Sequence, residues 1–380
     1  MKIEQSGWTA GRGWEPATPG ALGESAQLVL VFGATALLQD SRHIQDIREA
    51  YPRAHVLGCS TAGEICGARV FDDSLVATAV HFEDTLLQGA KIDLSEVPDS
   101  YRAGERLALA LDHTGLVHVL VISDGTRVNG SELVRGLAGH LPPHVAITGG
   151  LAGNGARFDQ TLVCLNGMPE NGQVAIIGFY GTRLKVGYGS VGGWDPFGPE
   201  RIITRSSGNV LYELDGQSAL ALYKKYLGTH AADLPASGLL FPLSLRVRED
   251  DTGIVRTILG INEEEQSITF AGDVPEGAYV RLMKANFDRL IDGANQAAQA
   301  SYETIGSTPP ELAILISCVG RKLVLKQRIE EEVESVREIL GDGTVLTGFY
   351  SYGEISPFTP SARCELHNQT MTITTFAERL

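Results

Sequence analysis

The sequence contains little cysteine, and none of it is arranged as a metal or disulfide motif. Five cysteines occur in 380 residues, an odd number without a Cys-x-x-Cys pair. Such a set argues against a disulfide framework and against a structural zinc site. We therefore expect a protein of the reducing cytoplasm.

Long apolar runs and basic runs are also missing. The longest apolar stretch, Leu28 to Leu38, is too short to cross a bilayer. The net charge is −15, and no run of Lys or Arg offsets it locally, so we expect neither nucleic-acid binding nor membrane insertion. Residues 1–25 lack the apolar segment of a signal peptide, and we expect them to form a flexible N-terminal arm.

One turn sequence occurs twice, near opposite ends of the chain. The first copy is Gly58-Cys-Ser-Thr-Ala-Gly-Glu-Ile65, and the second is Gly348-Phe-Tyr-Ser-Tyr-Gly-Glu-Ile355. Both follow a short apolar or β-branched run and keep a glycine, a hydroxylic residue and Gly-Glu-Ile at the same spacing. This duplicated turn, which carries an acid, is the most informative feature of the sequence.

Each turn belongs to a longer repeat of strand, helix, strand and hairpin. Three copies can be recognised in the sequence, and their first predicted strands begin near residues 28, 117 and 311. Strand-helix-strand crossovers make neighbouring strands parallel, whereas hairpins make them antiparallel. The sequence thus predicts a mixed α/β fold with mixed parallel and antiparallel sheets, and a plain Rossmann sheet is disfavoured.

Two further segments bear on domain organisation. Residues 240–283 alternate as strands do and precede a helix over 286–303, which leaves open whether they are a fourth copy of the repeat. Residues 187–208 are rich in Gly and Pro and predict a crossover between two halves. We place the boundary near residue 200, giving α/β domains at 26–200 and 201–380.

The glycine turns have a chemical interpretation and a structural one. Glycines at strand ends let a ligand approach the main chain, whose amides would bind an anionic group, while Glu64 and Glu354 would bind a cationic one. The structural interpretation is that each Glu caps a backbone N–H within a tight turn. Asp124 and the glycine-rich stretch 149–155 also follow strands, but the Gly-Lys-Ser/Thr of a phosphate loop is absent.

Catalytic and metal chemistry have single-residue candidates. Cys59 is the best nucleophile, although no sequence feature supplies it with a histidine base. His367 stands just before the last strand, where it is either a hydrogen-bonded structural residue or an axial ligand of heme iron.

Six motifs in order resemble the FIST proteins, with N-terminal and C-terminal FIST domains. They are the two turns above, Gly149-Gly-Leu-Ala-Gly153, Gly193-Trp-Asp-Pro-Phe-Gly-Pro199, Tyr212-Glu-Leu-Asp-Gly216 and Leu366-His-Asn-Gln-Thr370. The resemblance runs from about residue 25 to residue 378.

The resemblance implies a bacterial sensory module that binds a small amino-acid-like ligand and signals through a separate partner, such as a histidine kinase. One branch resembles heme-containing nitric-oxide sensors, which would make His367 the iron ligand and heme b the cofactor. The ligand would bind between the two turns. The candidate contacts are Gly58, Cys59, Ser60, Thr61, Glu64, Asp124, Gly150, Asn154, Gly348, Tyr350, Ser351, Tyr352, Glu354 and Asn368.

Two alternatives to a sensor remain. One is a small-molecule hydrolase that uses Cys59, or Glu64 with Asp124. The other is a structural adaptor with a degenerate cleft.

Overall fold

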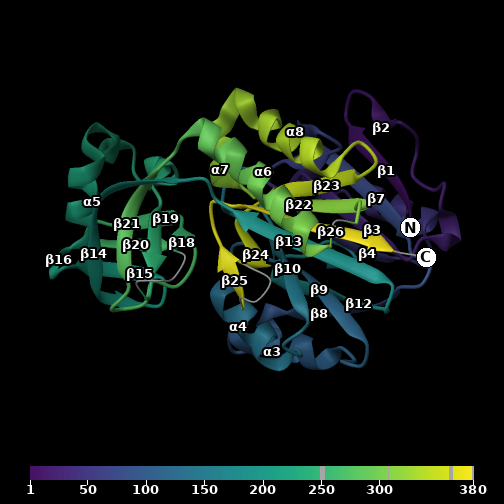
Figure 1. Ribbon diagram of the computed structural model, residues 1–380, viewed down its shortest axis with the longest axis horizontal. Coiled ribbons are helices and arrows are strands. Elements are labelled where there is room, and N and C mark those ends of the chain that lie inside the picture. Colours follow the sequence, from purple (N-terminus) through teal and green to yellow (C-terminus); the bar gives the residue numbers. More distant parts are fainter. Residues whose placement is uncertain (249–252, 307, 359–362, 379–380) are drawn as a thin grey trace.

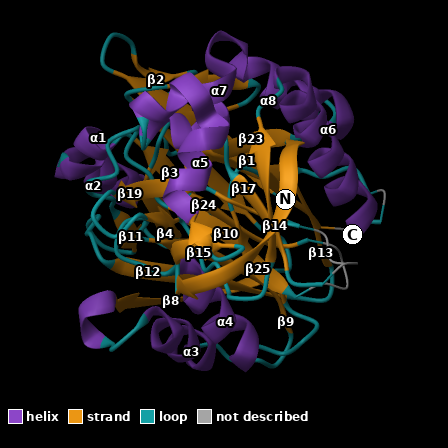
Figure 2. Cartoon of the chain, turned by 90° about the vertical axis from the view of Figure 1, so that its left-hand side faces the viewer, coloured by secondary structure: helices purple, strands orange, loops and turns teal. Residues whose placement is uncertain are grey.

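The computed structural model describes residues 1–248, 253–306, 308–358 and 363–378, and over these the fold is mixed α/β. Three six-stranded sheets form a large body, and a further sheet lies beside it (Figure 1). Strands occupy the middle of the large body and helices lie around it (Figure 2). Within the described ranges, no helix combines the length and the apolar composition that a membrane crossing requires.

The large body is built from three copies of one unit. The first contains β1 (Lys2–Thr9), β2 (Gly13–Glu15), η1 (Gly23–Ser25), β3 (Leu28–Gly33), α1 (Thr35–Gln39), α2 (Ser41–Ala50), β4 (His55–Ser60), β5 (Glu64–Cys66), β6 (Arg69–Phe71) and β7 (Ser74–His81). The second contains β8 (Leu86–Asp93), η2 (Leu94–Glu96), α3 (Ser100–Ala110), β9 (Leu116–Ser123), α4 (Gly130–His140), β10 (Ala146–Leu151), β11 (Val163–Leu165) and β12 (Gln173–Tyr180). The third contains β13 (Leu184–Val191), α6 (Phe287–Thr304), β22 (Leu312–Cys318), α7 (Val319–Leu325), η5 (Lys326–Arg328), α8 (Ile329–Leu340), β23 (Val345–Ser351), β24 (Gly353–Pro357), β25 (Cys364–His367) and β26 (Met371–Glu378).

Each unit supplies one sheet with the same central order. A parallel pair (β3 with β4, β9 with β10, β22 with β23) is flanked by an antiparallel strand (β7, β12 or β26), which in turn pairs with β1, β8 or β13. The parallel pairs come from the crossovers and the antiparallel pairs from the hairpins. The expected mixture of strand directions is confirmed.

The three units also exchange one strand each, in a closed cycle. β5 of the first unit pairs with β23 of the third, β24 of the third pairs with β10 of the second, and β11 of the second pairs with β4 of the first. β5 follows the turn after β4, β24 follows the turn after β23, and β11 follows the loop after β10. The exchange therefore brings the turns of all three units together.

Apolar residues from all three sheets share one inner core. Alternate residues of β3, β9 and β22, such as Leu30, Leu120 and Ile314, are buried in the same cluster. The opposite faces of the sheets pack against helices, with α2 covering the first sheet and α3, α4, α6 and α8 covering the others. Burial on both faces explains why these strands are continuous apolar runs.

An insertion between β13 and α6 forms the fourth sheet, which has eight strands over the described residues. It contains β14 (Asp195–Ser207), β15 (Val210–Leu214), β16 (Gln217–Ser218), α5 (Ala219–Leu227), η3 (Gly228–Asp233), η4 (Ala236–Leu240), β17 (Leu243–Arg246), β18 (Ile254–Arg256), β19 (Ile258–Asn262), β20 (Ser267–Phe270) and β21 (Tyr279–Lys284). Its described strand pairs are all antiparallel, so residues 240–283 are not a fourth copy of the repeat. The expected boundary near residue 200 stays a prediction.

Two expectations about the ends and the middle of the chain differ from the structure. Residues 1–25 are expected to be a flexible arm, yet Lys2–Thr9 pairs with β7 along its whole length. The Gly-rich segment 187–208 is expected to be a crossover, but it contributes to two strands, β13 and β14. A Cβ on Gly187 or Gly189 would lie about 2 Å from carbonyl oxygens of α6 (2.1 and 2.2 Å), so these glycines let the helix pack directly on the strand.

The segment between β22 and β23 forms two helices in place of one continuous helix. Lys326 has a positive φ of 51°, and α7 ends just before it while α8 begins at Ile329. Apolar residues continue at helical spacing across this break, so the sequence pattern alone predicts one continuous helix.

Candidate functional site

The two repeated turns meet, as the sequence predicts. The amide of Ala62 donates to the carbonyl of Tyr350, and the amide of Tyr350 donates to the carbonyl of Gly63, both at 2.8 Å. The third unit of the cycle joins them, since the amide of Gly153 donates to the carbonyl of Ser60 at 2.9 Å. Three backbone segments that are distant in sequence thus share one junction.

The first acid, Glu64, is enclosed at this junction. Its carboxylate accepts hydrogen bonds from the hydroxyl of Thr61 and from the hydroxyl and amide of Ser74, the last two at 2.6 and 3.2 Å. The side chain is 1% exposed, and this burial raises the pKa of Glu64 to about 7 against the opposing effect of the hydrogen bonds.

The second acid, Glu354, has matching contacts. It accepts from the hydroxyl of Ser351 at 2.5 Å and from the hydroxyl and amide of Thr370 at 2.9 and 3.1 Å. Burial raises the pKa of Glu354 to about 8. Each Glu therefore caps a backbone N–H, which confirms the structural interpretation of the turns, and ligand contact by these acids stays a prediction.

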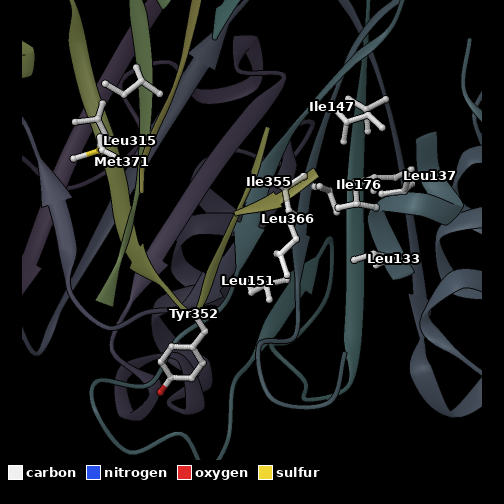
Figure 3. Packing of buried hydrophobic residues seen from close by; sticks show 14 of the residues in the cluster. Leu133, Leu137, Ile147, Leu151, Ile176, Leu315, Tyr352, Ile355, Leu366 and Met371 are labelled. Carbon is white, nitrogen blue, oxygen red and sulfur yellow. The ribbon is translucent and has the colours of Figure 1, made fainter. Parts of the chain in front are cut away.

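The two tyrosines of the second turn face different surroundings. The hydroxyl of Tyr350 donates to Glu332 at 2.7 Å inside a buried network that includes Arg321. The hydroxyl of Tyr352 accepts from the amides of Asn154 and Phe158, at 2.9 and 3.1 Å, and its ring stacks on Phe158. Figure 3 shows Tyr352 with Leu151 nearby in the same cluster.

The glycines of the candidate site allow close approach between strands. A Cβ on Gly58 or Gly348 would lie 2.4 or 1.8 Å from a carbonyl oxygen of the parallel neighbouring strand, and Gly150 pairs with Glu354. At Gly58 and Gly348 a side chain would collide with the neighbouring strand, so these glycines allow the parallel strands to pair at the junction.

Cys59 and Asp124 lie in the interior. Burial raises the pKa of the Cys59 thiol well above its usual range, which disfavours the thiolate that a nucleophile needs. Asp124 accepts from the amides of Thr126, Arg127 and Gly172 at 2.7, 2.7 and 2.9 Å, and so fixes the loop after β9. Neither residue shows the geometry of a catalytic pair.

His367 and Asn368 lie where the large body meets the insertion. The Nε2 of His367 donates to the carbonyl of Ser356 at 2.9 Å, and burial lowers the pKa of this imidazole to about 4. A carbonyl oxygen can only accept, so Nε2 carries its proton and is not open to iron. Nε2 of His367 is therefore not available as an axial heme ligand in this structure, and heme stays a prediction from the resemblance.

A groove that the sequence analysis does not identify separates the insertion from the large body. Its volume is about 1200 Å³. One wall comes from α4 and the strand β25, and the other comes from β17, β18 and the loop before β21. Among the residues lining it are Ser131, Val134, Ala138, Leu245, Ile254, Arg256, Asp273, Phe358 and Leu366.

Several buried polar atoms at this seam have no hydrogen-bond partner among the described residues. They are Ser131 Oγ, Thr257 Oγ1, Asn368 Nδ2 and Gln369 Oε1. Asn368 and Gln369 come from the Leu-His-Asn-Gln-Thr motif, and Gln369 has a positive φ of 64°. Unpartnered polar groups and backbone strain of this kind are common at ligand sites and at moving interfaces. This motif is the one sequence signal that points to the seam.

Comparison with known proteins assigns the chain to a family. The model of the FIST N domain matches residues 27–217, and that of the FIST C domain matches residues 219–357. An uncharacterized protein of Methanocaldococcus jannaschii is 22% identical over 329 residues, which are 80% of this chain and 62% of that protein. The chain thus spans less than two thirds of that relative.

Among solved structures, a cyanuric acid hydrolase from A. caulinodans overlaps 78% of this chain and 100% of its own, at 11% identity and a TM-score of 0.18. A likeness this weak supports no conclusion about activity.

The two matches follow one another along the chain in the order that the motifs predict. The chain therefore belongs to the FIST family, with a FIST N domain followed by a FIST C domain, which are sensory signalling domains.

Proposed function

We propose that this FIST protein is a non-enzymatic sensor whose small ligand occupies the groove between the insertion and the large body. The groove carries this proposal, because at about 1200 Å³ it is large enough for a metabolite and both of its walls bear polar and apolar side chains. The amino-acid-like ligands implied by the family resemblance fit such a mixed lining.

A ligand at this place would bias the relation between the two parts of the chain. Residues 192–194 and 285–286 connect the insertion to the large body, and the Leu366–Gln369 motif contacts it. A ligand that touches both walls favours the arrangement in which it makes more contacts. A separate partner protein, such as a histidine kinase, would bind one arrangement of the two parts more tightly than the other.

The repeated turns are the second candidate location for the ligand. Their supporting observation is the shared junction at Ala62, Tyr350 and Gly153. Two substitutions separate the locations. Ala138→Trp fills the groove from an exposed helix position, whereas Glu354→Gln changes the turn with little change of shape.

The first experiment is a thermal-shift screen of amino acids, nucleotides and hemin. A ligand present at a hundred times its Kd adds about 2.7 kcal/mol to the free energy of unfolding. Titration calorimetry of the best compound then compares the variants. We expect Ala138→Trp to remove binding and Glu354→Gln to keep it, with Ala110→Trp as a matched control outside the groove.

If Glu354→Gln removes binding and Ala138→Trp keeps it, the ligand binds at the repeated turns and the proposed location in the groove is wrong. Hemin has its own readout: a Soret band that appears on hemin addition and disappears in His367→Ala would support the heme hypothesis despite the geometry described above.

A further inference from the structure

Arg256 is a buried cation that forms no ion pair with any residue that the structure describes. Its side chain lines the groove at the end of β18, and the residue is 6% exposed. The guanidinium donates from Nε to the carbonyl of Asp273 at 3.2 Å and from Nη1 to the carbonyl of Leu366 at 2.9 Å. Within the described ranges it forms no ion pair, although the carboxylates of Glu365 and Asp273 act on it through space. A buried charge in this state is costly unless an anion joins it.

Ser131 places an unused hydroxyl beside this cation. Its Oγ is buried and has no hydrogen-bond partner in the part of the chain that the structure describes. A Cβ on Gly272 would lie 2.9 Å from Arg256 Nε and 3.1 Å from Ser131 Oγ, so both side chains, which line the groove, meet beside Gly272. Ser131 also stands in the first turn of the eleven-residue helix α4, whose N-terminus favours negative charge.

The lining of the groove is basic in a strongly acidic protein. Arg135, Arg246, Arg256 and Arg363 line it together with His144, whereas the acidic residues in the lining are Asp273 and Glu365. Arg246 is paired with Glu200 and Arg135 with Glu132, so these two charges are partly neutralised. The two other arginines of the lining, Arg256 and Arg363, belong to a chain whose net charge is −15. Apolar side chains, including Leu245, Ile254 and Phe358, continue the wall.

We propose that the groove binds an organic oxyanion, a carboxylate or phosphate, whose headgroup is held by Arg256 and Ser131 and whose apolar body lies along the remaining wall. This inference rests on the proposed function. Nε and Nη1 of Arg256 already donate to backbone carbonyls, so the N–H groups of Nη2 are the ones that would bind the headgroup, and the Ser131 hydroxyl would donate a further hydrogen bond.

The test uses four probes of equal length with the full chain: hexanoate, hexyl phosphate, hexanol and hexylamine. We expect hexanoate or hexyl phosphate to bind at least tenfold more tightly than hexanol and hexylamine in titration calorimetry, and the tighter of the two identifies the headgroup. Binding should weaken with salt, because the attraction is electrostatic.

The decisive variant is Ser131→Asp, which sets a carboxylate beside Arg256 and suits the start of a helix. We expect it to raise the melting temperature of the free protein and to weaken anion binding at least tenfold. Ser41→Asp makes the same charge change in the exposed first turn of α2 and should leave binding unchanged. Arg256→Lys keeps the positive charge but removes the Nη2 N–H groups of the guanidinium, and we expect it to weaken anion binding as well.

Three outcomes would overturn the inference: anions that bind no better than hexanol or hexylamine, anions that do not bind at all, or anion binding that Ser131→Asp leaves unchanged. If hexanol or hexylamine binds and Ala138→Trp abolishes that binding, the groove remains the ligand site and only the oxyanion is wrong. If a ligand from the screen binds regardless of Ala138→Trp, the proposed function fails.

Discussion

The amide of Ala62 donates a 2.8 Å hydrogen bond to the carbonyl of Tyr350, joining turns from opposite ends of the chain. This bond belongs to the closed exchange in which β5, β24 and β11 each complete the sheet of another unit. The three units consequently depend on one another for their sheets.

The exchange predicts that the chain cannot be divided where the two family matches meet. A fragment of residues 1–217 would lose the partners of β5, β10 and β13, which are β23, β24 and β26. We expect neither this fragment nor residues 218–380 to show a cooperative thermal transition by circular dichroism. Coexpression of the two should restore it. Two fragments that melt cooperatively on their own would show that the halves fold independently.

The two buried acids predict that stability falls as pH rises. Burial raises the pKa of Glu64 to about 7 and of Glu354 to about 8, from 4.5. The folded state then binds more protons than the unfolded state between these values, so the stabilisation is complete below about pH 4.5 and is lost as pH rises towards 8. At about 1.4 kcal/mol per pKa unit, this linkage amounts to roughly 3 kcal/mol for Glu64 and roughly 5 kcal/mol for Glu354. Urea unfolding across pH 5 to 8 should show a steeper decline for the native chain than for Glu64→Gln or Glu354→Gln, and equal slopes would refute the linkage.

The packing of α6 on β13 predicts a large cost for one methyl group. A Cβ on Gly189 would lie 2.2 Å from the carbonyl oxygen of Ala297, a backbone atom that cannot move aside freely. We expect Gly189→Ala to lower the free energy of unfolding by roughly 1–3 kcal/mol or more. Gly260→Ala is the matched control, because Gly260 also lies in a strand but has open space at its Cβ position. A cost at Gly189 equal to that at Gly260 would contradict the close approach.

The buried network under Tyr350 predicts a contrast between two neighbouring acids of α8. Glu332 is fully buried and accepts hydrogen bonds from Arg321, Ser317 and Tyr350, whereas Glu331 pairs with Arg328 at the surface. Glu332→Gln leaves the buried charge of Arg321 unpaired, and we expect a cost of roughly 3–5 kcal/mol. Glu331→Gln should cost about 1 kcal/mol or less. Similar losses in chemical denaturation would mean that Glu332 is not the compensating charge.

Local sequence patterns predict the units but not the way in which they pair. The apolar runs at Leu28–Gly33 and Leu312–Cys318 mark buried strands, because such runs are long enough and bounded by turns. Glu64 in β5 pairs with Phe349 in the neighbouring strand β23 of the same sheet. No local sequence pattern encodes a pairing between positions so distant in the chain. In β13, glycines that normally indicate a loop are required by the contact with α6.

The groove is harder still to find from the sequence. In the sequence, Ser131 is an ordinary residue near the start of a predicted helix. Arg256 is a polar residue in a segment whose alternating pattern predicts a strand. Their importance arises from the meeting of the insertion with the large body, which only the fold reveals. The motif at Leu366–Thr370 offered the one hint, since Leu366 accepts a hydrogen bond from Arg256.

Hydrogen exchange tests the ligand's location most directly. The best compound from the screen is added, and amide protection is measured along the chain by mass spectrometry. The groove predicts that added protection falls on the start of α4 and on residues 254–258 and 364–368, on both sides of the seam. Protection confined to residues 60–64 and 350–354 would contradict the groove and place the ligand at the repeated turns.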